Sequence, residues 1–505
     1  MQKILLVLVS VILSFLAYSQ SKSDVVSGEH GMLNIKENKS ATFQRTQHPD
    51  AQWFGESENS FGYFIHWSIC SVKKMNISWV MIAARSWESP LGSKHISDST
   101  ERQRIIDKKD YYLDGRSVIT PNEYWEQAKD FNPSNYNPDK WIKAAADAGM
   151  KYAVLTCRHH DGFALWPSNY GNFSTKNYLH SRDFVAEYVK ACRKYKLKVG
   201  LYYSSPDWYF EREYKNFLDP TTARINPELP ELDANLEPRI VNKSKTDIAE
   251  HRKAYMIYIK SQIEELLTKY GKIDILWFDG YPFAEAKESI TMDRIRQLQP
   301  GIIVNPRMHG YGDFKTFERN LPMQKPDPST WYEYNNPWCS SWVYMDEKPR
   351  HSSSVIGELV RCKSLGINYL LDVGPMANGD LQPEMYEGLA EVKSWMKTYS
   401  EAVNKILPLP ATETASVFAT ASENNKNRYL FLLTKFSLQS YKSLKELMLP
   451  AVDEELSIQN ISKPKRVLMM KSRAILPFTY ENNSVKIIVP KSFRSAEVDV
   501  VKVEL

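Results

Sequence analysis

Residues 273–280 read IDILWFDG, a run of apolar residues that ends in a carboxylate and a glycine. Such a short apolar run, bounded by turn residues, is typical of a strand buried on both faces of a parallel sheet. Further runs of the same kind lie at 61–65, 152–156, 199–203, 302–304 and 369–371. The pattern predicts a sheet of parallel strands that extends through most of the chain.

Amphipathic helical stretches separate these strands. They lie at 141–148, 183–195, 246–270, 292–298 and 352–365, and Asp183 is a candidate N-cap. Repeated alternation of strand and helix over residues 55–404 predicts an α/β fold, a (β/α) TIM-like barrel that carries the catalytic site. A doubly wound sheet is the alternative, but the sequence has no Gly-rich phosphate loop of the kind that fold uses.

The pattern changes after residue 404. Short runs at 428–433, 466–469 and 484–489, and an almost alternating end at 497–505, are typical of antiparallel strands joined by polar turns. We therefore expect a C-terminal antiparallel β-sandwich over residues 405–505. Residues 85–120 are polar and charged, and they predict a loop-rich insertion in the barrel.

The amino-terminal segment has the features of a secretory signal peptide. Lys3 precedes an apolar run from Ile4 to Leu16, and a small-x-small cleavage site follows at 17–19. The run is short for a membrane span, which disfavours an uncleaved anchor. We expect residues 1–19 to be removed, residues 20–54 to form a flexible lead-in, and the mature protein to be secreted or periplasmic without a membrane span.

Composition excludes several other classes. Lys and Arg number 65 against 60 Asp and Glu, so the net charge of +5 is weak, and no clustered basic face suggests a nucleic acid partner. An odd number of widely spaced cysteines favours buried thiols over a disulfide framework, and no Cys/His spacing is typical of zinc. We expect no metal and no cofactor, and the sequence leaves the oligomeric state open. The five cysteines are Cys70, Cys157, Cys192, Cys339 and Cys362.

Polar and aromatic side chains gather directly after the predicted strands. In a (β/α) barrel the carboxyl ends of the strands share one face, where active sites lie. Their convergence there predicts a polar pocket with aromatic walls. In chain order these residues are His66 and Trp67, then His159, His160 and Asp161, then Tyr202, Tyr203, Asp207 and Trp208, then Trp277 and Asp279, then Asn305 and Arg307, and near a sixth strand Glu333 and Trp342.

Two carboxylates in such a pocket favour glycoside hydrolysis. One carboxylate stays ionised as the nucleophile, and the other holds a proton for the leaving oxygen. Asp279, beside Gly280 at a strand end, has the accessibility that a nucleophile needs. Neutral imidazoles and an arginine are suited to hydrogen-bonding several sugar hydroxyls in a compact pocket.

Several blocks of the chain resemble the α-L-fucosidases of glycoside hydrolase family 29. The block YGDFKTFERNLP at 311–322 resembles the family's loop before its acid/base segment. The resemblance covers about residues 55–400 and implies a barrel followed by a sandwich, with a fucosylated glycan as the partner. The other blocks are FGYFIHW at 61–67, YAVLTCRHHDGFALWPS at 152–168, GLYYSSPDW at 200–208, LWFDG at 276–280, NPR at 305–307 and INYLLDVGPMANGDL at 367–381.

The resemblance implies a retaining exo-α-L-fucosidase with Asp279 as its nucleophile. Glu333 lies nine residues before Trp342, which is the family's spacing for the acid/base glutamate, although neighbouring motif residues differ. Glu318 is the alternative acid/base. The residues that we expect to bind substrate are His66, Trp67, His159, His160, Tyr203, Trp208, Trp277, Arg307 and Trp342.

Two departures from the family affect the leaving-group side of the pocket. Ser68 stands where the family usually has glycine, and Ser78 stands where many members have glutamate. Two alternative functions stay open. One is a fucose-binding homologue with weak catalysis. The other is a related α-L-glycosidase such as an α-L-galactosidase, because apolar walls reject an added hydroxyl only weakly.

Overall fold

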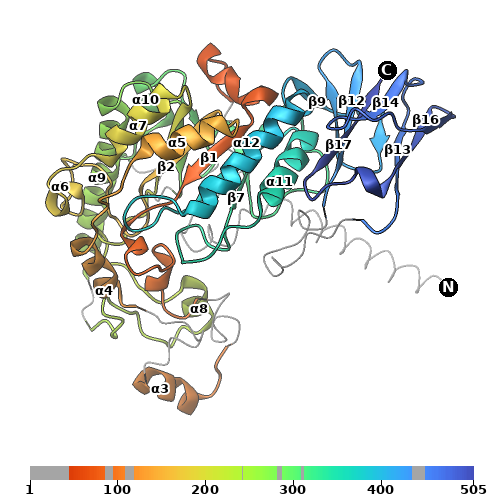
Figure 1. Cartoon of the computed structure of the whole chain (residues 1–505). Helices are drawn as coiled ribbons and strands as arrows, with labels where there is room; N and C mark the ends of the chain where they lie inside the picture. Colours follow the sequence, from red (N-terminus) through yellow and green to blue (C-terminus); the bar gives the residue numbers. More distant parts are fainter. Residues whose placement is uncertain are drawn as a thin grey trace, which may run out of the picture.

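The computed structural model describes residues 45–85, 95–108, 119–240, 243–280, 287–308, 312–434 and 450–505. The predicted signal peptide and most of the predicted lead-in lie outside these residues, as do 86–94 and 109–118 of the predicted insertion. Figure 1 shows two units, a barrel with helices around it and a β-sandwich that ends the chain. Among the described residues, no helix is long and apolar enough to cross a membrane.

The larger unit is a nearly closed barrel of eight parallel strands in the order β5-β4-β3-β2-β1-β8-β7-β6. At the seam between β5 and β6, Asp313 bonds to Val304. Its backbone N–H donates to the carbonyl of Val304 (2.7 Å), and its carboxylate accepts from the N–H of Val304 (2.9 Å). The predicted barrel is therefore confirmed. The strands are β1 (Phe61–Ile65), β2 (Tyr152–Arg158), β3 (Lys198–Tyr203), β4 (Ile275–Phe278), β5 (Ile303–Val304), β6 (Phe314–Glu318), β7 (Trp331–Pro337) and β8 (Asn368–Val373).

Helices separate most of these strands along the chain, but among the described residues none lies between β5 and β6 or between β6 and β7. Asp183 caps α7 as predicted, because its carboxylate accepts from the N–H of Ala186 (2.9 Å), one of the donors that a first helical turn leaves without a partner. In the region predicted as loop-rich, α3 (Ser99–Lys108) is a helix, and Figure 1 shows it standing apart from the barrel. The others are α4 (Pro121–Glu126), α5 (Pro138–Asp147), α6 (Thr175–Tyr178), α7 (Phe184–Lys194), α8 (Pro220–Ile225), α9 (Lys245–Lys269), α10 (Met292–Leu298), α11 (Ser352–Leu365) and α12 (Pro383–Val403).

The barrel interior is filled by apolar side chains. Successive residues of a strand point to opposite faces, so every second side chain of each strand points inward. At the amino end, Trp53 and Phe54 of the 3-10 helix η1 (Pro49–Gly55) pack against this interior. The filled interior leaves the carboxyl end for polar chemistry. The inward side chains include Phe64, Tyr152, Val154, Tyr202, Ile275, Trp277, Ile303, Phe314 and Leu370.

The C-terminal unit consists of two antiparallel sheets with strand orders β10-β13-β16-β15 and β14-β17-β12-β11-β9. The sandwich is confirmed, and it packs on two helices of the barrel. The indole of Trp395 in α12 donates to the carbonyl of Val498 (2.7 Å), and Ser353 in α11 donates to the carbonyl of Ala496 (3.0 Å). The strands are β9 (Ile406–Pro408), β10 (Thr414–Ala415), β11 (Ala419–Ser422), β12 (Asn427–Leu432), β13 (Glu454–Gln459), β14 (Arg466–Met469), β15 (Phe478–Glu481), β16 (Ser484–Val489) and β17 (Asp499–Glu504).

Candidate active site

Asp279 lies directly after β4 at the carboxyl end of the barrel. Gly280 follows with φ of 78°, in the left-handed region that favours glycine, so the chain turns away as soon as the strand ends. The Asp279 carboxylate contacts Nη1 of Arg307 at 2.5 Å and accepts a hydrogen bond from the Tyr202 hydroxyl at 2.6 Å. The carboxylate is thus held by a cation on one oxygen and by a neutral donor on the other.

These neighbours determine the charge of Asp279. Burial by itself raises the pKa of its carboxyl group, but the charge of Arg307 lowers it, and the hydrogen bond from Tyr202 acts in the same direction as Arg307. The net pKa of Asp279 lies well below its ordinary value, so the group is ionised at neutral pH. A fixed, ionised carboxylate at a strand end is suited to nucleophilic attack.

Two histidines present a ring nitrogen to Asp279. Nε2 of His160 lies 3.5 Å, and Nε2 of His159 lies 4.0 Å, from the Asp279 carboxylate. Burial lowers the pKa of both rings, to about 4 for His160. Both imidazoles are therefore neutral at pH 7. The Oγ of Ser78 lies 2.7 Å from Nδ1 of His159, so Ser78 helps to position that ring.

The hydrogen bonds of His160 assign its tautomer. Its Nδ1 bonds to Oγ of Ser204, and this hydroxyl donates to the carbonyl of Pro206 at 2.8 Å. Because the single hydroxyl proton of Ser204 is used there, Nδ1 of His160 carries the ring proton and Nε2 is an acceptor. Nε2 of His160 is therefore ready to accept a hydrogen bond from a hydroxyl group.

His66 is held by a carboxylate that the sequence reasoning missed. Its Nδ1 lies 2.5 Å from Oδ1 of Asp372, an inward residue of β8. Burial raises the pKa of Asp372 to about 6, although His66 opposes this shift. The His66 ring also lies near Trp342, with ring centres 5.5 Å apart. Asp372 therefore orients His66, as carboxylates commonly orient functional imidazoles.

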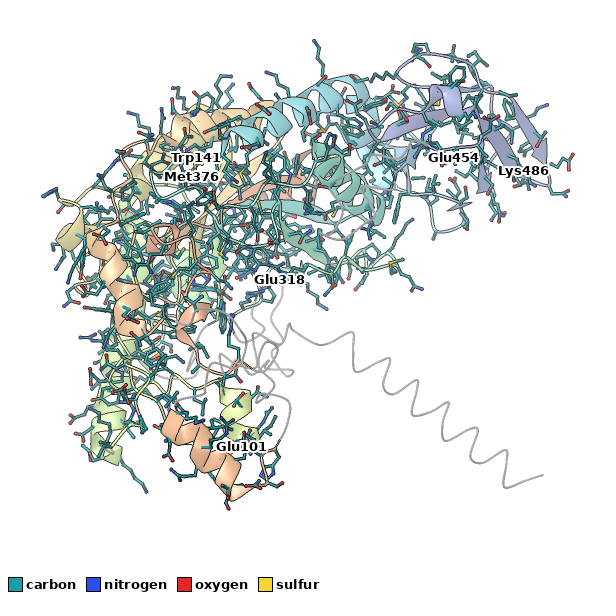
Figure 2. The ribbon with its side chains drawn as sticks, turned by 60° about the horizontal axis from the view of Figure 1, so that its bottom comes forward. Glu101, Trp141, Glu318, Met376, Glu454 and Lys486 are labelled. Atoms are coloured by element: carbon teal, nitrogen blue, oxygen red, sulfur yellow. The ribbon has the colours of Figure 1, made fainter. Side chains whose placement is uncertain are left out.

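Glu318 shares a cation with Asp279. It is the last residue of β6, and its carboxylate binds Nη2 of Arg307 while Nη1 of the same guanidinium binds Asp279. The guanidinium also lies over the Trp277 ring, 4.8 Å from its centre. Two carboxylates from different strands thus flank one arginine at the carboxyl end of the barrel. Figure 2 labels Glu318 on the barrel, away from Glu454 of the sandwich.

Glu333 lies deeper in the barrel. It is the third residue of β7 and 0% exposed, and it accepts hydrogen bonds from Tyr152 (2.8 Å) and from the indole of Trp277 (2.9 Å). Trp277 precedes Asp279 by two residues on the same face of β4, so Glu333 belongs to the interior layer beneath Asp279. Burial raises the pKa of Glu333 to about 7, with partial opposition from these two hydrogen bonds.

Two residues predicted to bind substrate face the helices instead of the pocket. The indole of Trp67 donates to the carbonyl of Met376 (3.0 Å), and its ring packs against Phe184 of α7. The Tyr203 hydroxyl donates to Gln262 of α9 (3.0 Å). Alternate residues of a strand face opposite sides, so Tyr202 occupies the inward position that the prediction gave to Tyr203.

The remaining predicted aromatic residues lie beside the polar groups. The Trp208 ring centre lies 5.2 Å from that of His160. Trp342 packs on His66, and the guanidinium of Arg319 lies 4.7 Å from the centre of the indole. These contacts give the site its expected aromatic walls.

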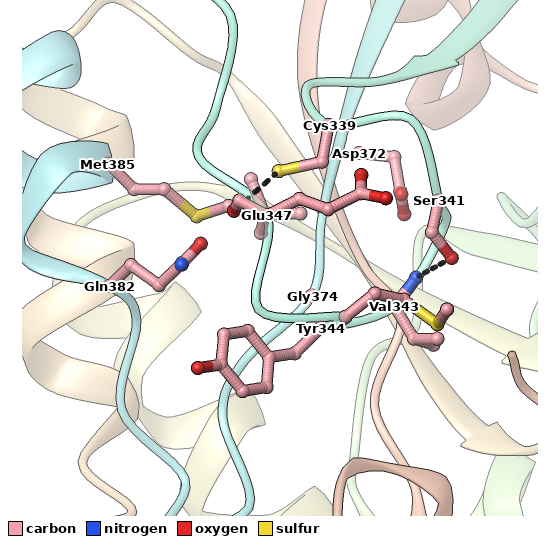
Figure 3. A pocket seen from close by; sticks show the side chains of 11 residues that line it. Cys339, Ser341, Val343, Tyr344, Glu347, Asp372, Gly374, Gln382 and Met385 are labelled. Atoms are coloured by element: carbon pink, nitrogen blue, oxygen red, sulfur yellow. Dashed lines mark hydrogen bonds between the residues drawn. The ribbon is translucent and has the colours of Figure 1, made fainter. Parts of the chain in front are cut away.

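A narrow pocket adjoins the site at Asp372, which is one of the residues that line it (Figure 3). The loop that carries Trp342 forms one wall, through residues such as Cys339 and Tyr344, and Gln382 forms another. The pocket contains neither Asp279 nor Glu318, and it shares only Asp372 with the site. We therefore assign the chemistry to the carboxyl end of the barrel and not to this pocket.

Three side chains of the candidate active site meet one geometric condition for a metal site. His159, His160 and Asp279 offer three ligand atoms that lie within 4.8 Å of one another. Arg307, in contact with the Asp279 carboxylate, places a positive charge where a divalent cation would bind and opposes it. Neutral imidazoles, a carboxylate and a guanidinium match the donors and acceptors of sugar hydroxyls better than they match a cation.

The barrel and its paired carboxylates define a glycoside hydrolase. The family model of alpha-L-fucosidase matches residues 29–401, and the chain belongs to this family. Tissue alpha-L-fucosidase from Mus musculus is 28% identical over 397 residues, which cover 74% of this chain and 78% of that protein. The corresponding protein from Homo sapiens is 28% identical over 368 residues, which cover 70% and 69%.

Solved structures show the same architecture. Alpha-L-fucosidase isoenzyme 1 from Paenibacillus thiaminolyticus is 25% identical with a TM-score of 0.67, and the match covers 90% of this chain and 99% of that chain. An alpha-L-fucosidase of the same family from Bacteroides thetaiotaomicron is 22% identical with a TM-score of 0.63, over 91% and 96% of the two chains. The second likeness supports the fold alone.

Proposed function

We propose that this protein is a secreted or periplasmic exo-α-L-fucosidase that removes terminal α-L-fucose from glycans with retention of configuration. The observation that carries the proposal is the arrangement of Asp279 and Glu318 on either side of Arg307. Two carboxylates at the ends of β4 and β6 supply a nucleophile and an acid/base catalyst. Family membership supplies the expectation that the sugar is fucose.

In the first step, the ionised Asp279 attacks the anomeric carbon of the fucosyl residue. The bond from that carbon to the leaving oxygen breaks, and Glu318, which enters this step in its protonated form, donates its proton to this oxygen. The products are a fucosyl ester of Asp279 and the shortened glycan. Arg307 contributes positive charge beside both carboxylates, and the Tyr202 hydroxyl donates to the oxygen of Asp279 that Arg307 does not contact.

In the second step, Glu318 takes a proton from a water molecule, which attacks the anomeric carbon of the ester. The ester bond breaks and the Asp279 carboxylate is restored. Free fucose leaves with the configuration that it had in the glycan. Glu318 is protonated again at the end, so the cycle closes without a cofactor.

We assign the acid/base role to Glu318, which was the alternative in the sequence analysis, and not to Glu333. Both carboxylate oxygens of Glu333 accept hydrogen bonds from Tyr152 and Trp277 inside the barrel, where a glycosidic oxygen has no access. Its pKa of about 7 suits an acid, but the acid must also lie within hydrogen-bonding reach of the proton acceptor. The place of Glu318 at the end of β6, where it shares Arg307 with Asp279, supports its assignment as the acid/base.

The three histidines bind sugar hydroxyls in this proposal. His160 accepts through Nε2, because Ser204 fixes the proton on Nδ1. His66 is oriented by Asp372 and lies against Trp342, so one ring contacts a hydroxyl and the indole covers an apolar face of the sugar. None of these rings needs to transfer a proton.

One experiment tests activity and stereochemistry together. The purified protein should release p-nitrophenol from p-nitrophenyl α-L-fucoside, and proton NMR of the early reaction should show α-L-fucose before mutarotation produces the β anomer. Early β-L-fucose would indicate an inverting enzyme. Binding of L-fucose without release of p-nitrophenol would favour the fucose-binding homologue. Preference for the α-L-galactoside would favour the related glycosidase.

A further inference from the structure

Asn335 points into the barrel from β7. Two residues earlier, Glu333 points inward, because it bonds to Tyr152 and Trp277 of the interior. The next residue, Asn336, points outward, because its amide donates to Glu358 of α11 at 2.8 Å. Side chains alternate along a strand, so Asn335 shares the inward face with Glu333 and lies one step nearer the carboxyl end.

The strand register places Asn335 among the groups of the active site. Asn335 is opposite Glu318 of β6 on one side and opposite Leu370 of β8 on the other. Its carbonyl accepts from the N–H of Arg319, the residue that follows Glu318 (3.0 Å). Leu370 precedes Asp372 by two residues on the inward face of β8. Asn335 therefore lies between the strands that carry Glu318 and Asp372.

The Asn335 side chain is buried without a hydrogen bond. It is 1% exposed, and neither its Oδ1 nor its Nδ2 has a partner among the residues that the structure describes. A buried amide in this condition costs free energy relative to an apolar side chain of the same size. Asp279 and Asp372, at the same end of the barrel, each have protein partners for at least one oxygen.

The chemistry of the amide indicates its ligand. Oδ1 accepts and Nδ2 donates, and a sugar hydroxyl also both donates and accepts. We propose that Asn335 binds a ring hydroxyl of the fucosyl residue on the side of Glu318 and determines specificity for it. This inference rests on the proposed function for the identity of the sugar. A sugar that lacks this hydroxyl leaves the buried amide without a hydrogen-bond partner. The protein therefore binds that sugar more weakly than it binds fucose.

Stability and activity should change in opposite senses when Asn335 is replaced. Asn335→Leu keeps a similar volume and removes both polar atoms, so Tm should stay the same or rise, while kcat/KM for p-nitrophenyl α-L-fucoside falls about 10- to 100-fold. Asn336→Leu is the matched control, because the same substitution on the outward face removes one of the hydrogen-bond donors to Glu358. The control should lower Tm and leave kcat/KM within about threefold of the wild type.

Sugars that lack one hydroxyl separate a binding role from a structural one, even if Asn335→Leu fails to fold. Calorimetry with L-fucose and its 2-, 3- and 4-deoxy analogues should show one analogue that binds the wild type about 10- to 100-fold more weakly than L-fucose does. In Asn335→Ala, the difference in affinity between L-fucose and that analogue should be smaller than in the wild type. A discrimination that is the same in both proteins would overturn the inference, and so would Asn335→Leu with lowered Tm and unchanged kcat/KM.

The two proposals fail differently. A wild-type protein that binds the sugars but does not hydrolyse the aryl fucoside overturns the proposed function, while the coupling of Asn335 to one hydroxyl is still measured by calorimetry. A wild-type protein that hydrolyses the fucoside but shows no coupling at any hydroxyl overturns the role of Asn335 alone. A protein that binds none of these sugars overturns both.

Discussion

Two buried carboxylates lie one layer apart inside the same barrel, and their pKa values move in opposite directions. Glu333 meets only neutral donors, the Tyr152 hydroxyl and the Trp277 indole, and burial raises its pKa to about 7. Asp279 meets the guanidinium of Arg307, which outweighs burial and lowers its pKa. For these two carboxylates the neighbouring charge, and not the depth of burial, determines the direction in which the pKa moves.

The two layers also differ in what their carboxylates can reach. Both oxygens of Glu333 are occupied by side chains of the interior, so Glu333 fixes the Trp277 ring that lies under the Arg307 guanidinium. Asp279 and Glu318 lie at strand ends and share Arg307. We call the layer that contains Asp279 and Glu318 the upper layer, and the layer that contains Glu333 the lower layer. The upper layer is suited to catalysis, and the lower layer supports it. The experiments below test this division.

The largest effect is expected for Asp279→Asn. The substitution keeps the shape of the side chain and removes the charge that attacks the anomeric carbon, so turnover should fall on the order of 10⁴-fold or more on every fucoside. Release of p-nitrophenol and of free fucose measures this. Asp274→Asn, the same substitution just before β4 at the opposite end of the barrel, is the control and should retain near-normal rates. Near-normal turnover in Asp279→Asn would remove the nucleophile from the upper layer.

Glu318→Ala should show the signature of a lost acid/base catalyst. Natural glycans should be cleaved about 10²- to 10⁴-fold more slowly, because their leaving oxygen needs a proton. An aryl fucoside should be affected less in the first step, because its leaving group is stable as an anion. Added azide should accelerate the variant by replacing base-activated water in the second step.

Glu333→Ala is the matched comparison for Glu318→Ala. It removes a glutamate from the lower layer and should show no acceleration by azide, although loss of its contacts to Tyr152 and Trp277 should lower Tm. If azide accelerates Glu333→Ala and not Glu318→Ala, the division between the layers is reversed. The spacing to Trp342 would then be the better guide to the acid/base residue.

His160→Ala removes one acceptor from the upper layer. The loss of a buried hydrogen bond to the sugar should lower kcat/KM by about 2–4 kcal/mol of transition-state stabilisation, roughly 30- to 1,000-fold. Steady-state kinetics on the aryl fucoside measure the effect. His251→Ala, on α9 and away from the site, serves as the control. Unchanged kcat/KM in His160→Ala would place this ring outside the sugar pocket.

The sequence predicts most of the strands because those strands are buried on both faces. Residues 61–65 correspond to β1 in full, and the other apolar runs overlap β2, β3, β4, β5 and β8. The sequence reasoning does not predict the strand β6. In FKTFE two polar residues stand between the two phenylalanines, so there is no continuous apolar run, and the family resemblance places this block in a loop. Apolar continuity detects a strand that is covered on both sides, and β6 is only partly covered.

The sequence motifs also predict which residues form the site. They do not predict how deep in the barrel each side chain lies. Asp279, His160 and Arg307 follow directly after their strands, so their places could be predicted from the strand ends. The choice between Tyr202 and Tyr203 depends on a single step of register, which reverses the face of the sheet. Glu333 matches the family's spacing, but spacing along a chain does not state whether a residue lies at the end of a strand or within it.

A pH experiment sharpens the comparison between the two layers. The pKa of Glu333 is raised in the folded state, so the folded protein holds a proton that the unfolded chain releases above its ordinary pKa of 4.5. Stability contributed by this group is present below pH 4.5 and is lost as pH rises towards 7. At pH 8 the buried charge costs up to about 3 kcal/mol relative to pH 4.5.

Glu333→Gln imitates the protonated acid and should remove this dependence. The difference in unfolding free energy between the variant and the wild type should therefore shift in favour of the variant from pH 5 to pH 8. Urea unfolding at the two pH values measures it, and Glu455→Gln on the sandwich surface serves as the control. A difference that is the same at both pH values would mean that Glu333 is ionised throughout and that the lower layer supplies an unseen charge partner.

The smallest effect is expected from metal chelation. His159, His160 and Asp279 meet the distance condition for a metal site, but the Arg307 guanidinium contacts Asp279 and opposes a second cation there. Hydrolysis by two carboxylates needs no metal. Incubation with EDTA followed by gel filtration should leave kcat/KM on the aryl fucoside unchanged, and added Zn²⁺ or Mn²⁺ should either have no effect or inhibit by occupying the histidines.

Loss of activity with EDTA and recovery with a divalent ion would show that the upper layer is organised around a cation and not around a sugar. Arg307 would then need to move away from Asp279 when the ion binds, and a structure with the ion bound would show this directly.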